Sequence, residues 1–156
     1  MGIKWKPLLK WLLILGLILA VPIYVCTDHF LTWLVKTVQD KKWESAPAVT
    51  LNVAGFYRWT LREGRSSETY KTFLLKYPEH ARYPEALYNY ALTMDEAACR
   101  RLETEKPRTP LLVYECNQVR DQAAEVFLYW ANTYQAVDPA KADRARKHAH
   151  RIQQGF

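Results

Sequence analysis

Residues 73–88 read FLLKYPEHARYPEALY and contain the end of one predicted helix and the start of the next. The apolar side chains before Pro78 recur at helical spacing, and proline does not continue a helix. A second proline, Pro84, follows Tyr83 at a position that the first turn of a helix accepts. The segment therefore predicts two helices joined by a short turn.

Helical periodicity extends from this segment in both directions. The chain contains only 5 glycines and shows no alternation of apolar and polar residues, so we expect an all-α domain of antiparallel helices. Gly64 is predicted to cap the first helix, and Ser66 or Ser67 to begin the second. The expected helices cover residues 49–63, 66–77, 83–103, 111–135 and 140–153. The predicted core contains Phe73, Tyr77, Ala86, Leu87, Tyr90, Phe127 and Trp130.

The N-terminal residues have the composition of a membrane anchor. Residues 8–25 form an apolar run with one charge, Lys10, and roughly 20 such residues cross a bilayer as a helix. A cleaved signal peptide is the alternative, although the small-residue pattern at 46–48 lies far downstream. Lysines before the run predict a single-pass protein, with its N-terminus in the cytoplasm and its domain outside.

The predicted organisation has three parts, and two sets of residues would contact the membrane or its proteins. An anchor and juxtamembrane helix cover residues 1–36, a linker with Pro47 as a helix breaker covers 37–48, and the helical domain covers 49–156. Gly16 and Ala20 lie on one helical face and permit close approach of a neighbouring transmembrane helix, or they merely face lipid. The expected membrane-interface contacts are Trp5, Trp11, Phe30, Trp33 and Trp43.

Positive charge is concentrated near the C-terminus of a chain whose formal net charge is +6. This basic surface is either a solvated helix face or a contact for anionic lipid or an acidic partner. Nucleic acid is not expected as a partner for a domain outside the cytoplasm. The predicted basic surface consists of Lys141, Arg144, Arg146, Lys147 and Arg151.

Two of the three cysteines flank a proline-containing turn. Cys99 and Cys116 lie nearly symmetrically about Pro107 and Arg108, so an antiparallel hairpin would place them at the same height. A disulfide is possible if the two faces match, and two unpaired thiols are the alternative.

The sequence contains no recognisable catalytic, cofactor-binding or metal-binding pattern. Cys-x-x-Cys, a glycine-rich phosphate loop and a nucleophile with a placed base are all missing from the sequence. His148 and His150 are two residues apart, so they point to different sides of a helix. We therefore expect a protein that is not an enzyme and that uses no cofactor.

Residues 73–88 resemble the tetratricopeptide repeats of bacterial envelope proteins, in which a helix ends in Phe-x-x-x-Tyr-Pro and the next begins Tyr-x-x-x-Ala-Leu-Tyr. The likeness is to the repeats of the outer-membrane-assembly lipoprotein and of the periplasmic coordinator of the Tol system. Residues 120–127 and 142–145 resemble a degenerate second copy, without the usual Tyr-Pro. The resemblance implies a helical scaffold that binds other proteins. It also implies that the anchor lies in the inner membrane and that the domain is periplasmic.

The predicted function is that of an accessory or scaffold subunit of an integral-membrane protein complex. It would dock through its anchor and its repeats, with integral-membrane subunits and the lipid bilayer as partners. The alternative is a free-standing membrane-tethered adaptor that binds a soluble protein or peptide in its repeat groove.

Overall fold

A computed structural model describes residues 27–155, in which every regular element is a helix. The chain divides into two compact units, Met1–Ala46 and Pro47–Phe156. One helix of the first unit covers residues 27–40. The all-helical prediction is therefore confirmed for the described residues.

The predicted fold class needs correction, because it included an N-terminal transmembrane helix in addition to the all-α domain. No helix within residues 27–155 is long and apolar enough to cross a membrane. The helix over 27–40 carries Asp28, Lys36 and Asp40, which are costly in hydrocarbon. The predicted span at 8–25 lies outside the described residues, together with Trp5, Trp11, Gly16 and Ala20.

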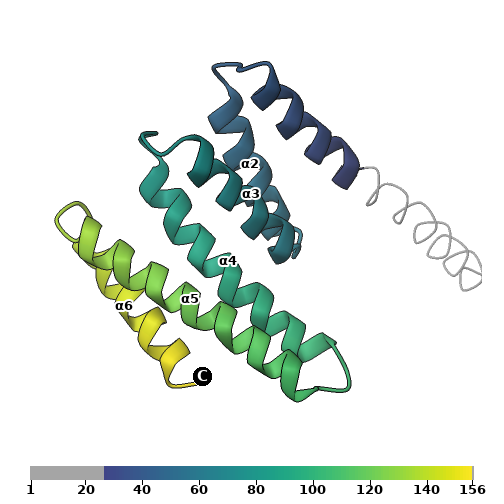
Figure 1. Ribbon diagram of the computed structural model, residues 1–156. Helices are drawn as coiled ribbons and strands as arrows, with labels where there is room; N and C mark the ends of the chain where they lie inside the picture. Colours follow the sequence, from purple (N-terminus) through teal and green to yellow (C-terminus); the bar gives the residue numbers. More distant parts are fainter. Residues whose placement is uncertain (1–26, 156) are drawn as a thin grey trace, which may run out of the picture. The chain divides into compact units, whose positions relative to one another are not determined.

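The first two helices of the second unit begin and end earlier than the sequence predicts. α2 covers Ala46–Trp59 and α3 covers Glu63–Lys76 (Figure 1). Pro47 does not break a helix but lies in the first turn of α2, where no intrahelical partner for its nitrogen is needed. The predicted linker therefore ends before Ala46.

Leu61, rather than Gly64, turns the chain after α2. The N–H of Leu61 donates to the carbonyl of Arg58 at 3.0 Å, and the N–H of Arg62 donates to that of Tyr57 at 2.8 Å. This pair of bonds is a Schellman motif, and Leu61 has the left-handed φ of 60° that the motif requires. Gly64 consequently lies inside α3, and neither Ser66 nor Ser67 begins that helix.

The remaining helices agree with the predicted boundaries to within a residue. α4 covers Tyr83–Thr104, α5 covers Pro110–Tyr134 and α6 covers Pro139–Gln153. Each has a proline in its first turn. The side chain of Thr109 accepts a hydrogen bond from the N–H of Leu112, and that of Asp138 accepts one from Lys141, so both residues cap a helix.

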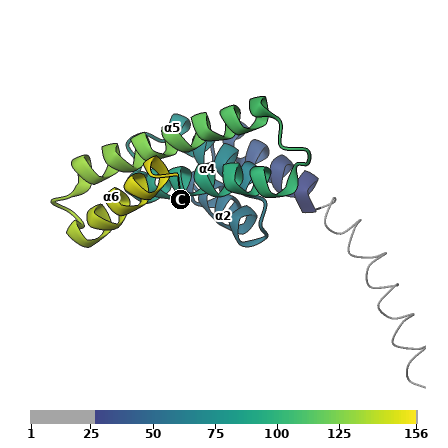
Figure 2. The ribbon, with the colours of Figure 1, turned by 90° about the horizontal axis from the view of Figure 1, so that it is seen from below.

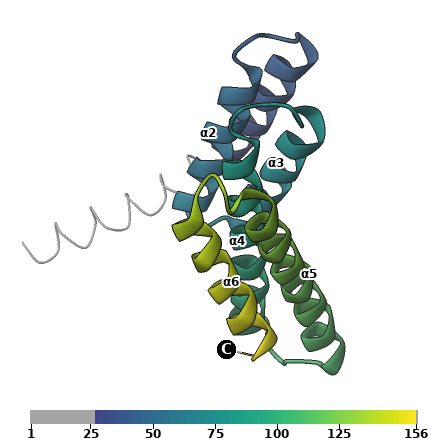
Figure 3. The ribbon, with the colours of Figure 1, turned by 90° about the vertical axis from the view of Figure 1, so that its left-hand side faces the viewer.

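The helices of the second unit stack in two layers. An ion pair joins α2 to α4, and Tyr88 of α4 contacts the ring of His148 in α6. α3 and α5 lie on the other side, as Figure 3 shows, and Figure 2 shows α5 on the opposite side from α2 and α6. This repeat-like arrangement is compatible with a helical-repeat scaffold.

Large aromatic side chains fill the core, with alanines allowing close approach of the helices. Phe73 of α3 packs against α2 and α4, while Phe127 and Trp130 of α5 pack against α4 and α6. The predicted core is confirmed for Phe73, Ala86, Leu87, Phe127 and Trp130, which are all buried. Tyr77 and Tyr90 are only partly buried.

Candidate functional site

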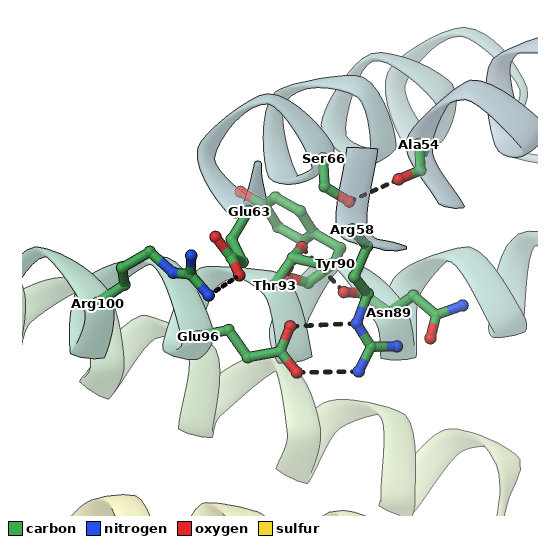
Figure 4. Close-up of polar contacts among 9 residues, drawn as sticks. All are labelled: Ala54, Arg58, Glu63, Ser66, Asn89, Tyr90, Thr93, Glu96 and Arg100. Carbon is green, nitrogen blue, oxygen red and sulfur yellow. Dashed lines mark hydrogen bonds and ion pairs between the residues drawn. The ribbon is translucent and has the colours of Figure 1, made fainter. Parts of the chain in front are cut away.

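A groove lies between α2, the start of α3 and α4. Its volume is about 700 Å³, and charged side chains make up half of its lining. Figure 4 shows the polar contacts at its centre. The groove is lined by Gly55, Arg58, Trp59, Leu61, Glu63, Tyr70, Glu96, Cys99, Arg100 and Glu103.

A bidentate ion pair crosses the groove from α2 to α4. The Nε and Nη2 atoms of Arg58 donate to the two carboxylate oxygens of Glu96 at 3.1 and 2.9 Å. Both side chains are 35% exposed. The hydrogen bonds to Glu96 raise the pKa of the Arg58 guanidinium above its ordinary value, although burial opposes them. The pair therefore fixes the separation of the two helices at this point.

A second ion pair holds the turn between α2 and α3 against α4. Glu63 is almost fully buried, and its carboxylate lies 2.8 Å from Nη2 of Arg100. Nη1 of the same arginine donates to the carbonyl of Leu61 at 3.4 Å. A buried carboxylate needs such a partner, so Arg100 accounts for the position of Glu63 (Figure 4).

Two large apolar side chains stand exposed at the rim of the groove. Trp59, the last residue of α2, is 79% exposed, and Leu61 is 61% exposed. Leu61 adopts a backbone conformation that glycine adopts at lower cost. Both side chains therefore contribute little to the core of the described domain.

Buried hydrogen bonds support the walls of the groove. Oγ of Ser66 donates to the carbonyl of Ala54 at 2.8 Å and so joins α3 to α2. Oγ1 of Thr93 donates to the carbonyls of Asn89 and Tyr90 within α4, both at 3.0 Å. These satisfied polar groups keep the groove walls in place without an unpaired hydroxyl (Figure 4).

The two described cysteines are free and lie in different surroundings. Cys99 is half-buried at the groove, with its sulfur 3.8 Å from a carboxylate oxygen of Asp95. Burial and then the charge of Asp95 raise the pKa of the Cys99 thiol, which disfavours the reactive thiolate. Cys116 is buried against Ala98 and Leu112. Both thiols are free in this structure, so the possible Cys99–Cys116 disulfide is not formed in it.

The acidic groups at the groove centre form ion pairs with arginines. Glu96 and Glu63 each have an arginine partner, and nearby Asp95 pairs with Arg120 at 2.9 Å. Residues 27–155 contain no cluster of three or more histidine, cysteine, aspartate or glutamate side chains that could hold a metal ion. The arrangement can bind charged and apolar groups, and it presents no activated nucleophile.

Among the described residues, none of the other predicted site residues apart from Cys99 is part of the groove lining. Phe30, Trp33 and Trp43 belong to the first unit and are each at least half exposed. The five predicted basic residues all lie in α6. Among them, Arg146 donates to the side chain of Gln135, and Lys147 lies 2.8 Å from Asp143. Their contact with a membrane or an acidic partner stays a prediction.

Sequence reasoning missed the groove and its ion pairs. Arg58 continues the helical spacing of Leu51 and Ala54 in α2, which is a signal that its side chain has a specific partner. That partner, Glu96, lies 38 residues away, and helical periodicity does not connect the two.

Comparison with protein-family models, with curated proteins and with solved structures found no match for this chain.

Proposed function

We propose that this chain is a non-catalytic scaffold that binds another protein through the groove between α2 and α4. The exposed Trp59 at the rim of an open groove is the observation that carries the proposal. The resemblance of residues 73–88 to tetratricopeptide repeats supports it, because such repeats bind other proteins.

The chemistry of the rim fits a protein partner better than a small molecule. Tryptophan is among the residues that contribute most to protein interfaces. Truncating a buried tryptophan there often costs about 2 kcal/mol or more of binding free energy. Arg58 and Arg100 lie beside it, and arginine is also enriched at interfaces. The groove is open to solvent rather than enclosed, which suits an extended or helical segment.

Two forms of this function remain as proposals. In the first, the chain is an accessory subunit of an integral-membrane complex, as the apolar N-terminal residues suggest. In the second, it is an adaptor that captures a peptide of a soluble partner. The groove supports the second form, because it provides a binding surface within the described helices.

The test is to isolate the full-length chain from native membranes and to compare the proteins that accompany two double variants. Trp59→Ala with Leu61→Ala removes the rim side chains, so we expect the partner to be lost. Leu75→Ala with Val137→Ala is the matched control, because these side chains are 74% and 80% exposed and lie away from the groove.

Equal recovery of the same partners with both double variants would contradict the groove proposal. Loss with both would indicate a general effect of surface change, and it would contradict the proposal equally. Circular dichroism of each variant establishes that the helical content is retained.

A further inference from the structure

A stripe of positive charge runs along one side of α6. Lys141, Arg144, Lys147 and Arg151 are spaced by three, three and four residues, so they project from neighbouring turns. The buried side of the helix carries Ala142, Ala145, Ala149 and Ile152. The four cations constitute what we call the α6 basic stripe.

Few acidic groups neutralise this stripe. Glu85 lies within reach of the charge of Lys141, but it is already paired with Arg82. Asp143 pairs with Lys147, but both side chains are at least 60% exposed, and exposed pairs of this kind are weak. Arg144 and Arg151 are exposed and form no ion pair within residues 27–155. The predicted basic surface also included Arg146, which bonds to Gln135 and lies off the stripe.

One end of the stripe is held in place by aromatic rings. Nζ of Lys141 lies 4.6 Å from the centre of the Tyr88 ring and 5.3 Å from that of Trp130. Both rings are buried, so they fix the ammonium group without neutralising its charge. Burial raises the pKa of the Tyr88 hydroxyl, and the nearby charge of Arg144 partly opposes this rise. Positive charge is thus gathered where α4 meets α6.

From this arrangement we propose that the α6 basic stripe is a docking surface for an acidic segment of another protein. This surface is separate from the groove between α2 and α4, and it would operate whether or not the groove binds a partner.

The apolar residues of α6 distinguish a protein partner from a lipid surface. Helices that lie in a membrane interface expose large apolar side chains, which enter the bilayer. In α6 the only large aliphatic side chain, Ile152, is 6% exposed and packs in the core. The exposed side of α6 therefore offers charged and polar groups without a large apolar side chain, which fits carboxylate groups on a protein.

The experiment measures binding of a fluorescein-labelled polyglutamate peptide to the full chain at low salt. Arg144→Gln with Arg151→Gln removes two stripe charges and keeps good helix-forming residues. Lys71→Gln with Lys106→Gln is the matched control, since it removes the same charge from exposed positions outside α6. We expect affinity to fall about tenfold for the stripe variant and by less than about twofold for the control.

Three results would overturn the proposal. Equal loss of peptide binding in both variants would indicate general attraction by net charge. Unchanged binding in the stripe variant would place the acidic ligand elsewhere. In the third result, the stripe variant still binds polyglutamate but no longer binds phosphatidylglycerol vesicles, with phosphatidylcholine vesicles as the reference. This result would assign the stripe to lipid. Thermal unfolding of both variants shows whether the helices remain folded.

Discussion

Arg58 of α2 and Glu96 of α4 are joined by two hydrogen bonds of 3.1 and 2.9 Å, although 38 residues separate them in the chain. The pair connects two helices that are not consecutive, because α3 lies between them in sequence and occupies the other layer. It is thus a direct polar connection within one layer of the domain.

The strength of this pair can be measured by a double-mutant cycle. Arg58→Gln and Glu96→Gln, singly and together, should give a coupling energy of about 0.5–1 kcal/mol in urea unfolding, because the pair is bidentate but one-third exposed. The same cycle on Arg65 and Glu68, which are more than half exposed, should give less than about 0.5 kcal/mol. A coupling energy of zero for the first pair would show that it does not stabilise the helix contact.

Phe73 is the side chain on which the contact of α3 with its neighbours depends. It is fully buried, and its ring centre lies 5.3 Å from that of Tyr77 and 5.4 Å from that of His80. Phe73→Ala should lower the free energy of unfolding by about 3–5 kcal/mol. Leu75→Ala, at a position 74% exposed on the same helix, should change it by less than about 0.5 kcal/mol. Similar values for the two variants would be incompatible with this packing.

Leu61 offers a way to separate stability from binding. Glycine accepts its left-handed conformation without the steric cost of a Cβ atom. Leu61→Gly should therefore leave the free energy of unfolding unchanged or raise it by up to about 1 kcal/mol, while partner binding at the groove weakens. Lys71→Gly, in the exposed middle of α3, should instead cost about 1 kcal/mol. A comparable loss for Leu61→Gly would mean that the leucine side chain stabilises the turn.

Glu85 should contribute to acid sensitivity. Hydrogen bonds from Arg82 at 2.8 and 2.9 Å lower the pKa of Glu85, against the effect of burial. A lowered pKa gives stability that is present above the unfolded value and is lost as the pH falls through the folded value. Both side chains are 46% exposed, so the contribution is below about 1 kcal/mol. Glu85→Gln should therefore show a smaller loss of stability than the parent between pH 5 and pH 3, and an unchanged loss would refute this role.

Local signals in the sequence were sufficient for the later helices. Pro84, Pro110 and Pro139 mark the first turns of α4, α5 and α6, and these helices begin where expected. The turn after α2 was predicted wrongly because Gly64 is a stronger capping signal than Leu61. The contact that holds Glu63 in α3 comes from Arg100, which is distant in sequence and adjacent only after folding.

The groove was beyond sequence reasoning for the same physical reason. Its ion pairs form between helices, and a pattern within one helix does not specify which charged residues of another helix face it. The basic residues of α6 were visible as a cluster in the sequence. The sequence did not show which of these side chains have partners. The structure places Asp143 beside Lys147, Gln135 beside Arg146 and Tyr88 beside Lys141.

The alanines on the buried face of α6 determine how firmly the last helix is attached. Ala142, Ala145 and Ala149 are fully buried, but each contributes only a methyl group to the core. α6 should therefore open locally at a lower free energy than α4 and α5, and its amides should exchange with deuterium before theirs. The α6 basic stripe moves with this helix. An acidic partner bound to the stripe would therefore stabilise α6 against local opening, and its occupancy could be followed as slower exchange along α6.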